Sequence, residues 1–200
     1  GSNLGGHLPG TRGGSIPDVN YYDGIYGKYH WGYSTIYSIS IGEGEVLTTP
    51  LQMANLACII ANRGFYHEPH AVRDVGGRGK PSSTDSIHFV NIDEGLFEPV
   101  IDAMQLVIED PSGTAWRSRV EGITICGKTG TVQNKDLEDH SAFMAFAPRD
   151  NPQIAISVYI EYAGGGGSWA APIAGLLIES YLTDSISDIN AENRIINWEE

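Results

Sequence analysis

The sequence predicts an α+β fold, in which an antiparallel sheet is packed against helices. Two segments with helical spacing and clear end signals come first, in residues 49–64 and 97–108. Three short β-prone runs follow them, and another helical segment lies near the end of the chain. This order is typical of helices layered on an antiparallel sheet. With 200 residues, the chain is long enough for one domain with a sizeable core.

The first 34 residues are predicted to form a loop-rich entry to this domain. Gly-Gly, Pro-Gly and Pro-Asp pairs recur as far as Asp18, and an aromatic-rich stretch runs from Tyr21 to Tyr33. These are turn signals with little periodicity, so neither a helix nor a strand is expected here. The aromatic side chains are expected to cover core surface, as partly buried Tyr and Trp residues commonly do.

Helix end signals are clearest at Thr49. Its hydroxyl can cap a helix, Pro50 suits the first helical position, and Gln52 completes a capping box three residues later. Apolar residues then recur at helical spacing, and Gly64 supplies a left-handed stop.

A second helix is predicted over residues 97–108, and Pro111 prevents its continuation. Between the two helices, residues 72–86 have the polarity of an exposed loop. The apolar residues of the second helix share one face: Leu96, Val100, Met104, Val107 and Ile108.

The three predicted strands occupy residues 123–126, 141–147 and 153–162. In the third, branched residues alternate with smaller or more polar ones, as in a half-buried strand. Asp-Asn-Pro at 150–152 is a hairpin-type turn between the last two strands. Four glycines at 164–167 are interpreted as a flexible joint that leads to the last helix.

The last helix is predicted over residues 168–182. Residues 183–200 form an acidic, weakly periodic tail to which no element is assigned. The larger apolar side chains of the helix lie on one side: Ile173, Leu176, Leu177 and Tyr181.

Charge and composition exclude several classes of function. The formal net charge is −13 and the pI is about 4.7, which argues against binding nucleic acid or anionic lipid. Cys58 and Cys126 are too few for a disulfide framework or a structural zinc site, and whether they pair is left open. The chain has no long apolar run and opens like the middle of a protein, so a fragment is expected.

One segment carries the residue types of a binding or catalytic site. At the end of the first β-run, Gly127 is followed by Lys128, Thr129, Gly130 and Thr131. A strand glycine lets a ligand approach the backbone, and an ammonium with neighbouring hydroxyls can bind a carboxylate. An exposed strand N–H can also donate to an oxyanion. Lys-Thr-Gly is a motif of penicillin-recognising serine enzymes, although three residues alone also fit a surface lysine and a turn glycine.

Six segments, in order over roughly residues 1–183, resemble the transpeptidase domain of class B penicillin-binding proteins. The opening, with Leu-Pro-Gly at 8–10 and Ser-Ile-Pro-Asp at 15–18, is most similar to the elongation-type group called penicillin-binding protein 2, in its Bacteroidetes-like version. The six segments are Ile-Gly-Glu-Gly with Thr-Thr-Pro-Leu-Gln-Met-Ala (41–44 and 48–54), Ala-Asn-Arg-Gly (61–64), Ser-Gly-Thr-Ala (112–115), Gly-Lys-Thr-Gly-Thr (127–131), residues 139–148 and Ala-Ala-Pro-Ile (170–173).

The resemblance implies a partial penicillin-binding-protein transpeptidase fold, similar to that of serine β-lactamases. It implies a D,D-transpeptidase that cross-links peptidoglycan stem peptides ending in D-Ala-D-Ala through a serine acyl-enzyme, which β-lactams also form. Lys128 would organise the proton network and attract the substrate carboxylate. Thr129 and Thr131 would bind that carboxylate beside Gly130, and the Thr131 backbone N–H would be an oxyanion donor.

The resemblance also implies where the whole protein works. No cofactor and no metal are implied. The expected partners are stem peptides, β-lactams and proteins of cell-wall elongation, with no nucleic acid. The expected location is the periplasmic face of the bacterial inner membrane, on an N-terminal anchor that is absent here.

Two of the three family motifs are missing from the sequence. No serine has a lysine three residues later, so the chain contains no nucleophile of the Ser-x-x-Lys type. Ser83-Thr84-Asp85 matches Ser-x-Asp, but it lies on the wrong side of the Thr49 helix for the family order. Residues 1–200 are therefore interpreted as the C-terminal portion of a single transpeptidase domain, which supplies one wall of the site and cannot acylate alone.

Two alternatives stay open. A β-lactam-sensing domain or a serine β-lactamase would share the Lys-Thr-Gly strand, although the pattern of residues 49–64 favours the cell-wall enzyme. A non-catalytic scaffold of the cell-wall machinery would share the fold and lack the nucleophile.

Four other features are interpreted as structural. At residues 67–70, Pro69 interrupts the helix that a His-Glu-x-x-His zinc site needs. The glycine run lacks the Lys-Ser/Thr ending of a phosphate loop. Cys126 is expected to be a small buried thiol, and His140 is expected to pack or to form hydrogen bonds.

Overall fold

The computed structural model describes residue 4 and residues 10–72 and 86–197. It confirms the predicted α+β class and the order of two helices, three antiparallel strands and a helix. The elements are α1 (Val19–Tyr26), α2 (Tyr33–Ser40), α3 (Pro50–Ala61), β1 (Phe65–His67), β2 (Ile87–Phe89), the 3-10 turn η2 (Glu94–Leu96), α4 (Phe97–Glu109), the 3-10 turn η3 (Trp116–Ser118), β3 (Cys126–Val132), β4 (His140–Ala147), β5 (Ile154–Ile160), α5 (Ala170–Thr183) and α6 (Ile189–Ile196).

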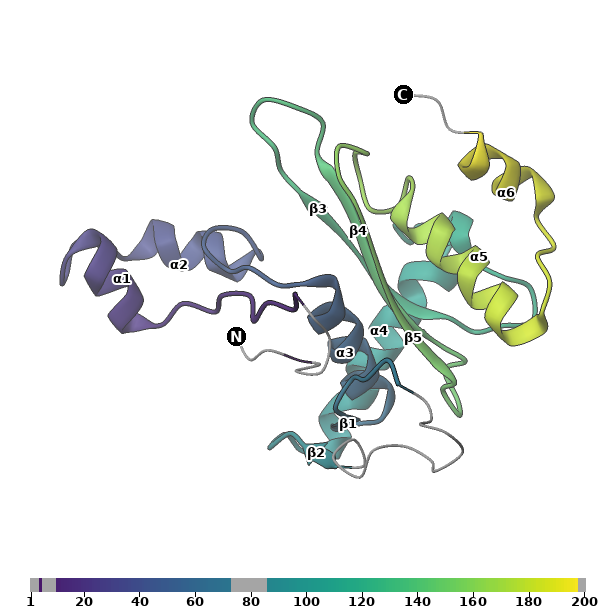
Figure 1. Ribbon diagram of the computed structural model, residues 1–200, viewed down its shortest axis with the longest axis horizontal. Coiled ribbons are helices and arrows are strands. Elements are labelled where there is room, and N and C mark those ends of the chain that lie inside the picture. The colour runs from purple at the N-terminus through teal and green to yellow at the C-terminus, as the bar shows by residue number, and fades with distance from the viewer. Residues whose placement is uncertain (1–3, 5–9, 73–85, 198–200) are drawn as a thin grey trace.

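A three-stranded antiparallel sheet lies at the centre of the fold, with strand order β3-β4-β5. Helix α5 packs on one face of this sheet, and α3 and α4 pack on the other (Figure 1). The predicted turn joins β4 to β5, with Asn151 in the left-handed region (φ 54°). Strands β1 and β2 form a separate antiparallel pair that follows α3.

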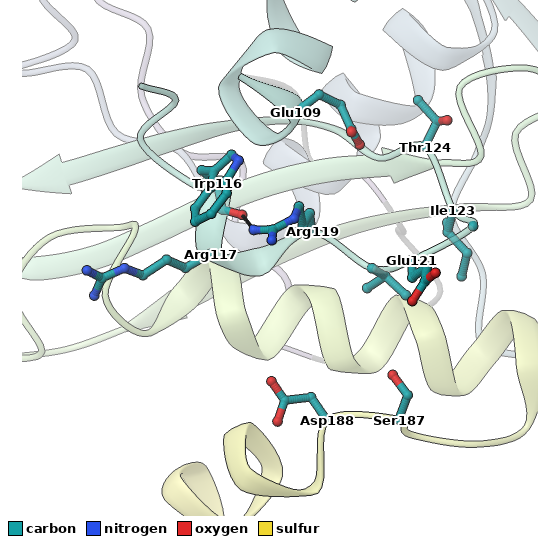
Figure 2. Close-up of a pocket in the computed structure, with 11 residues that line it drawn as sticks. Glu109, Trp116, Arg117, Arg119, Glu121, Ile123, Thr124, Ser187 and Asp188 are labelled. Carbon is teal, nitrogen blue, oxygen red and sulfur yellow. Dashed lines mark hydrogen bonds between the residues drawn. The ribbon is translucent and has the colours of Figure 1, made fainter. Parts of the chain in front are cut away.

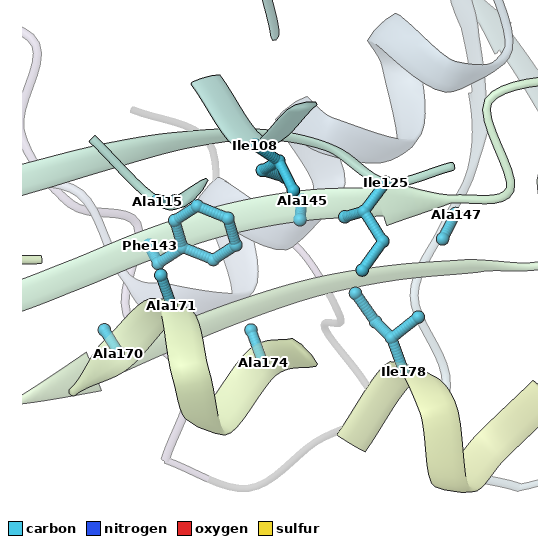
Figure 3. Close-up of a cluster of buried hydrophobic side chains, with 10 residues drawn as sticks. All are labelled: Ile108, Ala115, Ile125, Phe143, Ala145, Ala147, Ala170, Ala171, Ala174 and Ile178. Carbon is cyan, nitrogen blue, oxygen red and sulfur yellow. The ribbon is translucent and has the colours of Figure 1, made fainter. Parts of the chain in front are cut away.

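The alternation of β4 divides the core into two clusters. Phe143, Ala145 and Ala147 point to the α5 side (Figure 3), while Phe146 packs with residues of α3 and α4. Successive side chains of a strand face opposite sides, so one strand can supply both clusters. The central strand is therefore buried on both faces, and it supports the edge strand β3 beside it.

The capping box that starts α3 is present as predicted. The Thr49 N–H donates to Gln52 Oε1 (2.9 Å), and the Gln52 N–H donates to Thr49 Oγ1 (3.2 Å). Gln52 also donates through Nε2 to the carbonyl oxygen of Gly13 (2.7 Å), which ties the incoming chain to this helix.

The prediction that residues 1–34 contain only loops is wrong. Asp18 caps α1, because its Oδ1 accepts from the Tyr21 N–H (2.9 Å), and α2 follows from Tyr33. The aromatic side chains do not cover the core either. Tyr22 is buried, whereas Tyr29 and Tyr33 are more than four-fifths exposed.

The predicted inner sides of two helices also need correction. On α5, Leu177 and Tyr181 are exposed, and the buried side consists of small residues with Ile178 and Glu179. The helix approaches η3 so closely that a Cβ at Gly175 would lie 2.6 Å from the Ser118 carbonyl oxygen. Small residues allow this approach. On α4 the buried side chains are Phe97, Ile101, Met104 and Ile108, so Leu96 and Val100 were wrongly included.

Two predictions near element ends differ from the structure, and a third falls mostly outside the described residues. The first strand, β3, begins at Cys126 instead of ending there. The unassigned tail contains α6, capped by Asp188, whose Oδ1 accepts from the Ala191 N–H. The predicted loop at 72–86 lies almost wholly outside the described residues. The Ser83-Thr84-Asp85 segment also lies outside them.

Candidate functional site

The Lys-Thr-Gly segment lies within strand β3. Lys128 and Gly130 face one side of the strand and Thr129 and Thr131 the other, because strand side chains alternate. Lys128 and Thr131 are exposed, while Thr129 and Gly130 are half-buried. β3 is an edge strand of its sheet, so among the described residues its outer backbone edge has no strand partner. This edge can receive a ligand.

The Lys128 ammonium lies at the rim of this edge. Its Nζ donates to the carbonyl oxygen of Thr129 (2.7 Å), and within residues 10–72 and 86–197 no other hydrogen bond or ion pair holds it. The side chain is exposed, so an incoming anion can exchange with this backbone contact. The geometry therefore fits an ammonium group that turns toward a carboxylate when one is present.

The Thr129 hydroxyl meets a turn that follows α4. Its Oγ1 lies 2.8 Å from Thr114 Oγ1. The turn is held by Asp110, whose Oδ1 accepts from both the hydroxyl (2.5 Å) and the N–H (2.8 Å) of Ser112. These two hydrogen bonds hold the pKa of Asp110 below its usual range, and the bond from the Ser112 hydroxyl has the larger effect. A Cβ at Gly113 would lie 2.3 Å from the Val107 carbonyl oxygen, so only glycine fits there.

The glycine run 164–167 packs against β3, β4 and the Thr114 turn, and it joins β5 to α5 as expected. A Cβ at Gly166 would lie 2.3 Å from the Ala142 carbonyl oxygen and 2.5 Å from that of Gly130, and a Cβ at Gly167 would lie 2.2 Å from that of Thr114. Close packing therefore requires glycine at these two positions, in addition to the role of the run as a joint.

A buried serine ties this run to the sheet and to α5. Ser141 lies opposite Thr131 in the β3–β4 register and is fully buried. Its hydroxyl donates to the Gly165 carbonyl oxygen (3.0 Å) and accepts from the Ala170 N–H (3.1 Å). The central strand β4, the glycine run and the start of α5 are thus joined through one hydroxyl.

The other residues singled out in the sequence are structural. Burial raises the pKa of Cys126 to about 12, so its thiol is not a nucleophile, and burial also raises the pKa of Cys58. Both are free cysteines. His140 Nδ1 accepts from the Tyr162 N–H (3.0 Å), and its ring packs against Tyr159 and Tyr162, which confirms a packing and hydrogen-bonding role.

His67 and His70 lie in a strand and in the segment after it, without the geometry of metal ligands. His67 ends β1, and His70 Nδ1 lies 3.1 Å from the Glu68 carbonyl oxygen. Within residues 10–72 and 86–197, no three His, Cys, Asp or Glu side chains gather as metal ligands would. No described helix is both long enough and apolar enough to cross a bilayer.

A cavity of about 760 Å³ lies away from the motif, between the chain leading into β3 and the segment before α6 (Figure 2). The Arg119 guanidinium lies 3.7 Å from the centre of the Trp116 ring and donates to the Trp116 carbonyl oxygen. Glu109, Glu121 and Asp188 also line the cavity, so its charges are mixed in sign. Sequence reasoning did not anticipate it, and none of the residues that line it belongs to the Lys-Thr-Gly segment.

Thr114 and Ser141 are the neighbours of the motif that the sequence analysis did not single out individually. Both lie in segments that resemble the family, Ser-Gly-Thr-Ala and residues 139–148. Their proximity to Thr129 and Thr131 depends on strand register and on how the turn folds back, which no local pattern contains.

Comparison with known proteins gives the family. Residues 1–179 match the model of the penicillin-binding protein transpeptidase domain. The chain is 33% identical to peptidoglycan D,D-transpeptidase MrdA of Acinetobacter baumannii, over 98% of this chain and 32% of that protein. It is 29% identical to MrdA of Haemophilus influenzae, over 83% of this chain and 28% of that protein.

Solved structures agree with this assignment. A crystal structure of Pseudomonas aeruginosa PBP2 in complex with WCK 5153 superposes with a TM-score of 0.78 at 26% identity, covering 92% of this chain and 41% of that one. PBP2 of Helicobacter pylori, solved in complex with MreC, gives 0.76 at 25% identity, covering 92% and 34%. The chain thus spans about a third of the length of its curated relatives, and it belongs to the penicillin-binding protein transpeptidase family, in its PBP2/MrdA-type branch.

Proposed function

We propose that this chain is the C-terminal portion of the transpeptidase domain of a peptidoglycan D,D-transpeptidase. The observation that carries the proposal is the exposed edge of β3, where Lys128 and the hydroxyls of Thr129 and Thr131 lie on a strand whose outer edge is unpaired among the described residues. An edge of this kind suits an extended peptide that ends in a carboxylate. The relatives named MrdA carry the same activity in their names.

The proposed reaction proceeds through an acyl-enzyme. A serine from the part of the protein outside this chain attacks the carbonyl carbon between the two terminal D-Ala residues, and the terminal D-Ala leaves with the serine proton. An amine of a second stem peptide then attacks the ester, and the serine regains a proton. Lys128 would attract the substrate carboxylate and organise the proton network. Thr129 and Thr131 would bind that carboxylate beside Gly130, and the Thr131 N–H would donate to the oxyanion.

The proposed ligands and location follow the relatives. A Mycobacterium tuberculosis penicillin-binding protein A structure, 28% identical with a TM-score of 0.61, is an imipenem acyl-enzyme complex. We therefore propose that β-lactams acylate the complete protein. The Helicobacter pylori complex with MreC supports a partner from cell-wall elongation. An anchored position at the periplasmic face of the inner membrane and a Bacteroidetes-like origin stay predictions.

Intact-mass measurement after incubation with penicillin G tests the proposal. The 200-residue chain and a form extended through the preceding residues are compared. We expect an adduct on the extended form alone, because no serine in residues 1–200 has a lysine three residues later. An adduct on the short chain would contradict the division of the site. No adduct on either would favour the scaffold alternative, and rapid loss of the adduct would favour a β-lactamase.

A further inference from the structure

The contact between Thr114 and Thr129 joins two hydroxyl groups, and among the described residues neither is hydrogen-bonded to a charged side chain. The two Oγ1 atoms are 2.8 Å apart, and either can be the donor. Thr114 is exposed and Thr129 is half-buried at the binding edge of β3. Each hydroxyl has one hydrogen to donate and can also accept. The direction of this hydrogen bond is therefore set by whatever else Thr129 binds.

A carboxylate fixes that direction. An ionised carboxylate only accepts hydrogen bonds, so Thr129 must direct its single hydrogen at the ligand. Thr129 Oγ1 is then free to accept, and Thr114 is the group within reach to donate to it. Hydrogen bonds in such a chain polarise one another and become stronger together. A lone Thr129 hydroxyl would instead rotate among several acceptors.

We propose that Thr114 is a positioning residue for carboxylate recognition, whose hydroxyl donates to Thr129 Oγ1 and so aims the Thr129 hydrogen at the ligand. This rests on the proposed function of the β3 edge. Thr114 acts through Thr129 and does not contact the reacting atoms. The segment Ser-Gly-Thr-Ala thereby contributes to specificity for ligands that end in an anion.

The turn holds Thr114 where this role requires it. The Ala115 N–H donates to the Val107 carbonyl oxygen (3.0 Å), and the Gly113 N–H donates to that of Asp110 (2.8 Å). In addition, a Cβ at Gly167 would lie 2.2 Å from the Thr114 carbonyl oxygen, so the glycine run packs directly on the Thr114 backbone. The backbone of Thr114 is thus held by the turn and by the glycine run, and its hydroxyl is pre-organised.

The experiment uses the extended protein and measures the second-order rate of acylation by penicillin G and by its methyl ester. Thr114→Val keeps the shape and removes the hydroxyl. We expect it to slow acylation by penicillin G about tenfold, the order of one hydrogen bond to a charged group, and to slow the uncharged ester less than about twofold. Thr114→Ser should retain the wild-type ratio. Thr114→Ala replaces the valine variant if the latter does not fold, as judged by its melting temperature.

A double-mutant cycle separates this role from a merely structural one. In the Thr129→Val background, Thr114→Val should have no further effect, because the group it positions is gone. Thr183→Val is the matched control: it also removes a threonine hydrogen bond, from Oγ1 to the Glu179 carbonyl oxygen, but lies at the end of α5. Its acylation rates should equal those of the wild type.

Each outcome decides between the two proposals. If the wild-type extended protein is not acylated, the proposed function fails, and the role of Thr114 fails with it. If the wild type is acylated and Thr114→Val slows the acid and the ester equally, or adds to Thr129→Val, the positioning role is wrong while the proposed function stands. An unchanged rate with penicillin G would also overturn it.

Discussion

Two regions of the molecule are held together differently. We call β3, the turn at 110–115 and the glycine run 164–167 the wall, and residues 15–47, which contain α1 and α2, the arm. In the wall, backbones touch directly: Gly166 packs on Gly130, and Gly167 packs on Thr114. The arm projects away from the sheet (Figure 1). Two backbone hydrogen bonds between Ser15 and Leu47 close its base, and side chains hold the rest. There the hydroxyls of Tyr22 (3.2 Å) and Tyr26 (2.6 Å) both donate to Glu45. The wall should therefore tolerate little added volume, while the arm should respond mainly to changes in charge.

Glycine substitutions should give the largest difference between the two regions. In the wall, Gly166→Ala would force the run away from β3 and is expected to lower the free energy of unfolding by about 2–3 kcal/mol. In the arm, a Cβ at Gly24 meets nothing within 4 Å, and alanine favours the helix by about 0.5–1 kcal/mol. Urea unfolding of both variants measures this. Equal effects would contradict the contrast.

Serine substitutions should give a smaller difference. Ser141→Ala removes the partner of the Ala170 N–H and the Gly165 carbonyl, and leaving these groups unsatisfied costs about 1–3 kcal/mol. In the arm, Ser40 donates to the Ile36 carbonyl oxygen (2.7 Å) from an exposed position. Ser40→Ala is expected to change the free energy of unfolding by less than about 0.5 kcal/mol. Thermal melting of the pair would reveal a reversed order.

Lowering the pH should give the smallest difference between the two regions. It protonates Glu45 in the arm and Asp110 in the wall. The Tyr26 hydroxyl lowers the pKa of Glu45, as Ser112 lowers that of Asp110. A lowered pKa in the folded state means that each group stabilises the fold above its unfolded pKa, and that this stabilisation is lost as pH falls through the folded pKa.

Glu45→Gln should therefore remove part of the acid-induced change in tyrosine fluorescence of the arm, and Asp110→Asn should leave it unchanged. The measurement is a titration from pH 7 to about pH 3, across the ordinary carboxyl range. If Asp110→Asn altered the tyrosine signal as much as Glu45→Gln does, the arm and the wall would not be electrostatically separate.

The sequence predicted what depends on neighbours along the chain. The Thr49 capping box and the Asn151 turn are local patterns, and both are present. The third predicted strand is present as β5, although its burial does not alternate along the strand. Helix α1 was missed because the Pro-Asp pair at 17–18 was interpreted as a turn signal, whereas Asp18 caps the helix. Its tyrosines bond to Glu45, about twenty residues away.

The inner side of α5 could not be predicted from apolar size. Ala170, Ala171 and Ala174 are fully buried because the sheet lies close, whereas Leu177 is half exposed. At the site, the Lys-Thr-Gly strand was found from its residues and from the resemblance. The pairing of Thr114 with Thr129 depends on a tertiary contact, so the sequence pattern did not reveal it.

The bare contact between Gly166 and Gly130 limits how this wall can diversify in evolution. A Cβ at Gly166 would lie 2.5 Å from the Gly130 carbonyl oxygen, so position 166 cannot accept a side chain unless one of the two segments moves. Selection for a different ligand would therefore act on the hydroxyl and ammonium groups that project from the edge, while the shape of the edge is inherited unchanged. Variation in specificity within such a chain is expected to concentrate at Thr114, Lys128, Thr129 and Thr131.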